Sequence, residues 1–226
     1  MIGLPQGFLA FIADRLNDPS VGDLWKDPGE KLTKSQMTAI QSLHEKFAGS
    51  LAEFLSEWSK IPVKASLISL EQFPFEEFLR SVQRPGFMAG FKSDSLNGKA
   101  LLAIDLEVIF SLLDRHQGGG GDLPKPLRPL SEPETHLMEK AMGHIIGILR
   151  DSWMPVIDLD PTLEFFESNP QFAQIVPPHF KGLDIVFEIR IQSIYGTLRL
   201  FLPLATLKRV AGKFHVRNPG KRKTDP

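Results

Sequence analysis

The chain has 226 residues, of which 42% are hydrophobic and 23% charged, and its formal net charge is -1. This composition is ordinary for a globular protein with a sizeable core, and it gives no reason to expect a nucleic-acid partner. The absence of cysteine excludes disulfides and thiolate metal sites. No apolar run approaches the roughly 20 residues that cross a bilayer and no export signal is found, so a cytoplasmic protein is expected.

Residues 1–33 are predicted to form an N-terminal amphipathic segment and linker. A short apolar pattern covers residues 8–16, and residues 17–30 are rich in Pro, Gly and Asp. The amphipathic segment either binds a partner or packs on its own domain, and packing is slightly favoured. The folded body is expected to begin near Leu32.

The first half of the body opens with a helix over residues 33–60, because its apolar residues recur at spacings of three and four. Pro62 ends this helix. Further elements are then predicted in chain order: a strand at 63–70, a short helix at 74–82, paired strands at 86–93 and 98–105, and a closing helix at 106–115.

The second half repeats this order. Ser131 and Glu134 have capping-box spacing and predict the start of a second long helix, which runs to residue 153. Strands are expected at 162–168, 183–192 and 197–204, an irregular insert at 169–178, and a closing helix at 204–210. In the strand at 183–192 the isoleucines and Phe187 are expected to face the core, and Asp184, Glu188 and Arg190 to face away.

Neither half is expected to bury its apolar residues alone. The predicted fold class is therefore α/β, a single domain with internal pseudo-two-fold symmetry in which the long helices pack on one central mixed sheet. The domain is placed at residues 34–212, followed by a basic tail at 213–226, which holds five Lys or Arg and one Asp. Such a tail could contact nucleic acid or anionic lipid, but a short basic end is more often a solvated linker or a frayed terminus.

Four consecutive glycines, residues 118–121, are expected to link the two halves as an exposed hinge. Glycine is costly to order, so the segment is either tolerated slack or a docking surface. It lacks the Lys-Ser/Thr ending of a Walker loop, and it follows a helix where a dinucleotide-binding turn would follow a strand. Nucleotide binding is therefore not expected.

No catalytic, cofactor or metal site is predicted. The six histidines show no H-E-x-x-H pattern or other metal-ligand spacing, and no nucleophile elbow is found. Gly143 and Gly147 lie one turn apart in the second long helix, where each is costly. They are expected to allow close approach of another backbone, either the first long helix, which is favoured, or a neighbouring subunit.

Several stretches of the chain together resemble the middle domain of the FliM family of flagellar motor switch proteins, over about residues 34–210. "NPQFAQIVPP" is similar to the Asn-Pro-Gln-Phe-Ala segment of this family, and "LLDRHQGGGG" to its helix ending in a Gly-Gly-x-Gly loop. "RDSWMPV" has the family's Trp-x-Pro, and "HEKFAGSLAEFLS" resembles its first long helix.

The resemblance implies a CheC-like fold and a structural component of the flagellar motor switch, the C-ring at the cytoplasmic face of the inner membrane, and not an enzyme. It implies FliG and neighbouring FliM subunits as partners and leaves FliN and phosphorylated CheY open as others; the signal from CheY would set the direction of rotation. The implied FliG-binding residues are Gly118, Gly119, Gly120, Gly121 and Asp122. No cofactor is implied.

Three departures from the family affect this reading. Asp122 stands where many members have arginine, which reverses the charge offered to FliG. The N-terminus does not match the family's acidic CheY-binding peptide, and the chain stops where a FliN-like C-terminal domain usually begins, so that domain is expected to be absent.

Two alternatives remain. The same fold resembles the CheC and CheX phosphatases of CheY, whose signature is a glutamate followed three residues later by asparagine. No such pair occurs, and Ala141 and His144 stand at the corresponding positions. A secretion-associated structural module is the other alternative, because fold alone does not decide which assembly a protein joins.

Overall fold

The computed structural model describes residues 31–214. The N-terminal segment at 8–16 and the basic tail from residue 215 lie outside these residues. The elements in chain order are α2 (Lys34–Ser59), β1 (Val63–Pro74), α3 (Phe75–Ser81), β2 (Phe87–Ser93), β3 (Gly98–Ile104), α4 (Leu106–His116), α5 (Glu132–Trp153), β4 (Thr162–Glu167), β5 (Lys181–Ile191), β6 (Ile194–Pro203), α6 (Leu204–Val210) and a 3-10 turn (Ala211–Lys213). These elements agree with the predicted ones within a few residues at their ends, except that β1 extends to Pro74.

Local sequence explains where the long helices begin and end. Thr33 and Gln36 form a capping box at the start of α2, in which the Thr33 N–H donates to Gln36 Oε1 over 2.8 Å. Lys60 closes the helix in the left-handed conformation, with φ of 60°, two residues before Pro62. The predicted capping box of Ser131 and Glu134 is present at the start of α5.

The six strands form one sheet in the order β1-β5-β6-β3-β2-β4, and every neighbouring pair is antiparallel. The expected mixed sheet is wrong in this respect. Short connections join β2 to β3 and β5 to β6, and such hairpins force antiparallel pairing because a parallel pair needs a long crossover. The α/β class and the single sheet layer are confirmed.

The two halves of the chain exchange their outer strands. β1, from the first half, pairs with β5 of the second half, and β4, from the second half, pairs with β2 of the first. The strand order is therefore symmetric about the β6–β3 pair, as the expected pseudo-two-fold symmetry requires. Neither half can complete its own sheet, so the halves fold as one domain.

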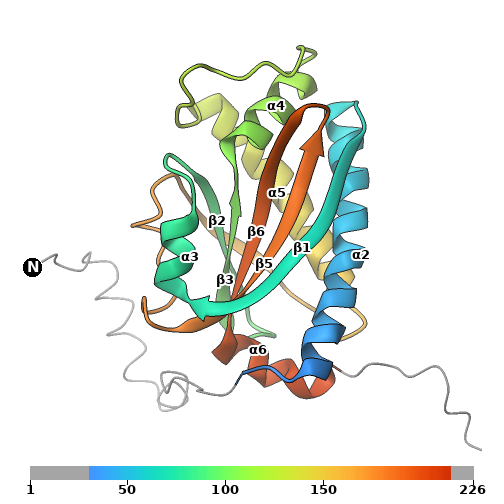
Figure 1. Ribbon diagram of the computed structural model, residues 1–226, viewed down its shortest axis with the longest axis vertical. Helices are drawn as coiled ribbons and strands as arrows, with labels where there is room; N and C mark the ends of the chain where they lie inside the picture. Colours follow the sequence, from blue (N-terminus) through green and yellow to red (C-terminus); the bar gives the residue numbers. More distant parts are fainter. Residues whose placement is uncertain (1–30, 215–226) are drawn as a thin grey trace, which may run out of the picture.

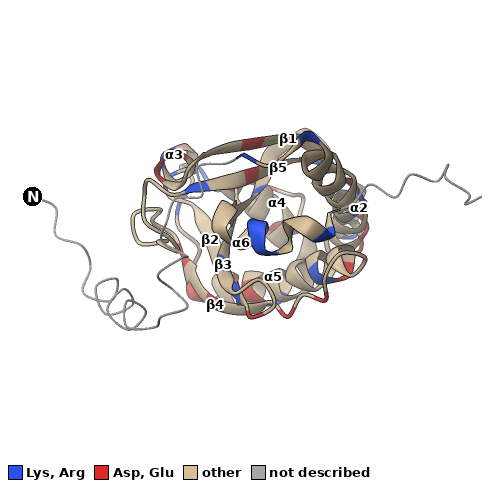
Figure 2. Ribbon diagram, turned by 90° about the horizontal axis from the view of Figure 1, so that it is seen from below, with Lys and Arg blue, Asp and Glu red and all other residues tan. Residues whose placement is uncertain are grey.

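Two apolar clusters cover the two faces of the sheet. The larger lies between the sheet and α2, α4, α5 and α6, and includes Phe47, Trp153 and Phe187. The long helices α2 and α5 run side by side behind the sheet in Figure 1, and α6 closes one end of this core (Figure 2). The smaller cluster lies on the opposite face, where α3 and the insert at 169–178 cover Phe201.

The two faces of β5 are populated as predicted, with one exception. The expected inward residues Ile185, Phe187, Ile189 and Ile191 are all buried. Asp184 lies on the opposite face but is also buried, only 2% exposed, where its carboxylate is paired with the Arg199 guanidinium at 2.7 Å. The expected solvent-facing Asp184 is therefore wrong, because α3 packs over this end of the sheet and β6 supplies a cation beside it.

Within residues 31–214, no helix is long and apolar enough to cross a membrane.

Candidate functional site

The glycine loop, residues 117–122, follows the last residue of α4, His116, at one end of the molecule. In Figure 1 it lies at the top, close to the tip of the β5–β6 hairpin. The side of the loop away from the body is open to solvent. Gly118, Gly119, Gly120 and Asp122 are exposed, and Gly121 is half-buried.

The carboxylate of Asp114, in the last turn of α4, fixes the conformation of this loop. Asp114 Oδ2 accepts hydrogen bonds from the N–H groups of Gly121, at 2.6 Å, and Asp122, at 3.1 Å. The N–H of Gly119 donates to the backbone carbonyl of Asp114 over 2.8 Å. One residue thus satisfies three of the amides that follow the helix, and the segment is a defined turn rather than slack chain.

The four glycines are needed for different reasons. Gly118 and Gly121 have φ of 93° and 88°, a left-handed conformation that other residues rarely adopt. A Cβ on Gly119 would overlap the carboxylate of Asp114. A Cβ on Gly120, by contrast, would meet no atom closer than Asp122 Oδ2, at 3.8 Å. Three of the glycines are required by the loop itself, and Gly120 is not.

Two further contacts anchor the end of α4 to the body. The Arg115 guanidinium donates to Gln192 Oε1 over 2.8 Å and so joins the loop to the β5–β6 turn, while the Arg115 carbonyl accepts from the N–H of Gly118. The ring of His116 stacks on Trp58, and His116 Nδ1 lies 2.9 Å from the Trp58 carbonyl oxygen. The loop therefore stands on three elements, α4, α2 and the β5–β6 hairpin.

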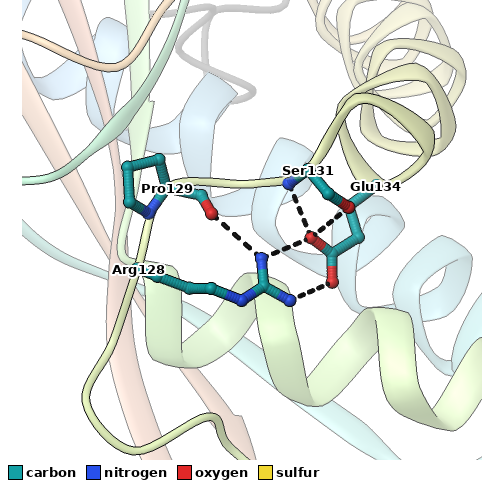
Figure 3. A network of polar contacts seen from close by, with 4 residues as sticks. All are labelled: Arg128, Pro129, Ser131 and Glu134. Carbon is teal, nitrogen blue, oxygen red and sulfur yellow. Dashed lines mark hydrogen bonds and ion pairs between the residues drawn. The ribbon is translucent and has the colours of Figure 1, made fainter.

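The segment between the glycine loop and α5 is also fixed, by a network of hydrogen bonds around Arg128 (Figure 3). The Arg128 guanidinium makes two hydrogen bonds to the Glu134 carboxylate, at 2.7 and 2.9 Å, and donates to the Pro129 carbonyl. Glu134 also accepts from the Ser131 N–H, and Arg128 lies over the ring of Phe110 at 5.0 Å. The hydrogen bonds from Arg128 lower the pKa of Glu134 to about 2. This network fixes the chain between the loop and α5.

Asp122 offers a negative charge beside the open part of the loop. Its side chain is exposed, and its N–H is already bound to Asp114. No ion pair to the Asp122 carboxylate is found between residues 31 and 214. The charge is therefore available to a partner.

Gly143 and Gly147 do not bring the two long helices together. A Cβ on either would meet nothing within 4 Å, so the favoured expectation of close approach to the first long helix is wrong. Both instead line a groove of about 750 Å³ between α2 and α5, over the stacked rings of Phe54 and His144. The remaining lining residues are Ser50, Glu53, Glu57, Lys140, Ile148 and Asp151. The alternative, contact with a neighbouring subunit, stays a prediction.

The residues at the phosphatase positions do not form an acid–amide pair. Ala141 is buried, 1% exposed, and His144 is exposed and stacked on Phe54 at 5.4 Å. Within the described part of the chain, no three His, Asp or Glu side chains are grouped so that they could hold a metal ion.

Asp114 was not among the residues singled out from the sequence. A signal for it exists, because a carboxylate in the last turn of a helix is unfavourable beside the negative end of the helix dipole. An acidic residue at that position, followed by glycines, suggests that its oxygens bind the amides beyond the helix. Gln192 carries no such signal, since only the fold brings it to Arg115.

Fold and site together define an α/β domain whose two halves exchange their outer strands and which exposes a glycine loop of fixed conformation at one end.

Comparison with known proteins shows the family to which this domain belongs. The family model described as "Flagellar motor switch protein FliM" matches residues 33–218. The FliM of Treponema pallidum is 35% identical over 184 residues, and that of Borreliella burgdorferi 34% over 189, covering 81% and 83% of this chain and 54% of each relative.

A chain in the crystal structure of a FliG–FliM complex from H. pylori has a similar fold, with a TM-score of 0.77 and 27% identity over 80% of this chain and all of that one. The present chain belongs to the FliM family of flagellar motor switch proteins. It spans about half the length of the curated relatives it matches. The expected resemblance to this family is confirmed.

Proposed function

We propose that this chain is a structural component of the flagellar motor switch that binds FliG through Gly118–Asp122. The observation that carries the proposal is the similarity to a chain of the FliG–FliM complex, at 27% identity over 80% of this chain. In this role the protein is not an enzyme, and it lies at the cytoplasmic face of the inner membrane because its partners do.

The geometry of the glycine loop supports this role. The loop is exposed, lies at one end of the molecule, and is anchored to α2, α4 and the β5–β6 hairpin through His116, Asp114 and Arg115. A force that a bound partner applies to the loop is therefore transmitted to the whole domain. A fixed loop also loses little conformational freedom on binding, which favours affinity.

The negative charge of Asp122 predicts the charge that FliG carries where it contacts the loop. Its carboxylate is exposed and has no ion pair between residues 31 and 214. The FliG that binds this chain is therefore expected to carry a positively charged side chain near Asp122. A FliG that binds a relative with arginine at this position would carry an acidic side chain there. Replacement of Asp122 by arginine then weakens binding, and replacement by asparagine weakens it less.

Other parts of the proposal concern further partners and the segments around the domain. Neighbouring copies of the chain contact one another in a ring, and the open groove beside Gly143 and Gly147 is a candidate surface for that contact. Signals from phosphorylated CheY, with FliN as a further partner, tilt the domain and so change the position of FliG. The domain is residues 34–212, between an N-terminal segment and a basic tail.

Binding of FliG from the same organism to the 226-residue chain tests the proposal by biolayer interferometry or calorimetry. Saturable binding that is weakened by Asp122→Arg and unchanged by Gly49→Leu supports it. Gly49 is a suitable control because it is exposed on α2 and a side chain there would meet nothing within 4 Å. Absence of binding by a folded chain, or hydrolysis of phosphorylated CheY by it, argues against the proposal.

A further inference from the structure

We propose that the groove between α2 and α5 is the docking site of the basic tail of the same chain, residues 215–226. The contact is intramolecular and uses a different surface from the glycine loop. It goes beyond the proposed function, because neither FliG binding nor any other part of that function requires it. Three observations carry it: the chemistry of the groove, the charge of the tail, and the place where the described chain ends.

The floor of the groove is apolar and open. Phe54 of α2 and Ile148 of α5 are half-buried there, and the ring of Phe54 stacks on that of His144. Gly143 and Gly147 add no side chains, and a Cβ on either would meet nothing within 4 Å. A groove of about 750 Å³ with this floor can hold an extended backbone and the methylene stems of long side chains.

The exposed side chains that line the groove are mainly acidic. They include the carboxylates of Glu53, Glu57 and Asp151 and one cation, Lys140. Glu53 and Glu57 lie one turn apart on α2, where two like charges destabilise a helix. In the described part of the chain neither of them forms an ion pair. The groove therefore favours an occupant with several positive charges.

The tail has the complementary charge. Its acidic residue is Asp225, and its basic residues after Phe214 are Arg217, Lys221, Arg222 and Lys223. The stems of Lys and Arg cover apolar surface while their charged ends reach carboxylates, and an Arg guanidinium also binds the face of an aromatic ring. A short basic tail alone is more often solvated, and the acidic groove is what gives this tail a place to bind.

The described chain ends beside the groove. Phe214 is buried and packs edge-on against Trp153, the last residue of α5, with ring centroids 5.6 Å apart. Just before it, the Ala211 carbonyl accepts a hydrogen bond from Gln36 Nε2 in α2 over 3.3 Å. The tail therefore leaves the body where α2 begins and α5 ends, at the lower end of the molecule in Figure 1. Asp151, close to Trp153 in the sequence, marks this end of the groove.

The tail is long enough to follow the groove. The α5 side of the groove, from Lys140 to Asp151, is about 17 Å long at the rise of an α-helix. Residues 215–226 reach up to about 40 Å from Phe214 when extended. The first basic residue of the tail can therefore reach Asp151, and the next three can reach the glutamates of α2. Because tail and groove share one chain, the effective concentration is on the order of millimolar, and weak contacts suffice.

A docked tail covers the surface that the proposed function offers to a neighbouring copy. This consequence, unlike the docking itself, rests on that part of the proposed function. A neighbour must displace the tail before it can close on Gly143 and Gly147. Free chains then associate less than the bare groove would allow.

A nitroxide label on the tail of the full 226-residue chain tests the docking. The chain has no cysteine, so Thr224→Cys gives a single attachment site. The label is expected to broaden the NMR amide signals of Gly143, His144 and Gly147. The matched control carries the same label and has glutamine at the four basic positions of the tail, which should reduce the broadening about fivefold. Salt of about 1 M should reduce it as well, because it screens the charges. Equal broadening by the control would overturn the docking.

An exchange of charges tests whether the groove is where the tail binds. Glu53→Lys together with Glu57→Lys should reduce the broadening about fivefold, and glutamate at the four basic positions of the tail should restore it in that variant. Both glutamates are exposed, so thermal stability is expected to stay unchanged. Glu45→Lys, exposed on α2 outside the groove lining, is the matched control and should leave the broadening as it is. Failure of the exchanged charges to restore the broadening would place the tail elsewhere and overturn the inference.

Two further measurements separate this inference from the lateral contact. An isotope-labelled chain without nitroxide is mixed with a nitroxide-labelled chain, and broadening of its groove signals would show that the tail comes from a neighbouring copy, so that intramolecular docking is wrong. In analytical ultracentrifugation the glutamine variant of the tail should associate more than the unaltered chain. If its association is unchanged while the docking signals are present in the unaltered chain, the docking stands and the proposed lateral contact at the groove fails.

Discussion

The imidazole ring of His116 lies flat on the indole of Trp58, with ring centroids 4.3 Å apart and planes inclined by 15°. His116 Nδ1 is also 2.9 Å from the Trp58 carbonyl oxygen. These contacts join the last residue of α4 to the end of α2. They hold the base of the glycine loop.

Replacement of His116 by alanine is expected to lower the free energy of unfolding by about 1–2 kcal/mol, because an aromatic contact and a hydrogen bond are lost together. Urea denaturation followed by Trp fluorescence measures the change. His136→Ala is the matched control, since His136 lies exposed on α5 and its ion pair, with Glu139 at 3.5 Å, is on the surface. Equal stability of the two variants would show that the stack contributes nothing.

A buried histidine is expected to make the fold sensitive to acid. His44 is completely buried, its Nδ1 lies 2.8 Å from the Ile40 carbonyl oxygen, and its Nε2 has no partner within residues 31–214. Burial lowers the pKa of His44 from 6.5 to about 4. The unfolded chain therefore binds a proton at this residue at pH values where the folded chain does not.

The sign of the pH effect follows from this difference. Above pH 6.5 the histidine is neutral in both states and costs nothing, and as the pH falls from 6.5 to about 4 the folded state loses roughly 3 kcal/mol relative to the unfolded state. Denaturation at a series of pH values measures the loss. His44→Leu is expected to remove this part of the pH dependence, and an unchanged slope in that variant would assign the acid sensitivity to other groups.

The buried pair of Asp184 and Arg199 fastens α3 to the sheet. Two hydrogen bonds link the groups, at 2.7 and 3.3 Å, and Arg199 also donates to Ser81 and lies over the ring of Phe78 at 4.9 Å. Burial raises the pKa of Asp184, and Arg199 opposes that rise. The carboxylate is therefore tolerated in this position because of its partner.

Arg199→Leu is expected to cost about 3–5 kcal/mol at neutral pH, because an unpaired carboxylate is left buried. The sign at other pH values follows from the raised pKa: a folded state that holds the proton more tightly is favoured by acid, so the loss is smaller at pH 5 than at pH 8. The double change Asp184→Leu with Arg199→Leu should recover much of the stability. A double variant as unstable as the sum of the single ones would show that the two residues act independently.

Periodicity predicted the helices and strands because the apolar residues that recur along the chain are those that reach the core. The inward set of β5, including Phe187 and Ile189, shows this directly. Pairing between distant strands has no such local signal, so the exchange of β1 and β4 between the halves was not predicted. The buried Asp184 was missed for the same reason, since its environment is made by β6 and α3.

The candidate loop was found from its glycines, but its internal organisation was not. The sequence shows that residues 118–121 are all glycine and so have a wide choice of backbone conformation. It does not show at which of these positions the folded loop can accept only glycine. That distinction depends on the two amides bound by Asp114 and on the dihedral angles of Gly118 and Gly121. The favoured expectation that Gly143 and Gly147 lie against the first long helix was wrong because spacing in a helix shows that two residues share a face and not what lies opposite.

The open groove beside Gly143 and Gly147 gives a last prediction. A glycine inside a helix is less favourable than alanine by about 1 kcal/mol, and a Cβ at either position would meet nothing within 4 Å. Alanine at both is therefore expected to raise the free energy of unfolding by up to about 2 kcal/mol. Chemical denaturation measures the gain.

Retention of glycines that destabilise the isolated domain is explained if neighbouring copies close on this groove. The double alanine variant should then be more stable and yet associate less at high protein concentration, as measured by analytical ultracentrifugation. Gly49→Ala, on the exposed side of α2 and outside the groove lining, is the matched control and should gain stability with no change in association. If the double variant associates as the unaltered chain does, the groove is not where copies meet, and the lateral contact must be sought on another face.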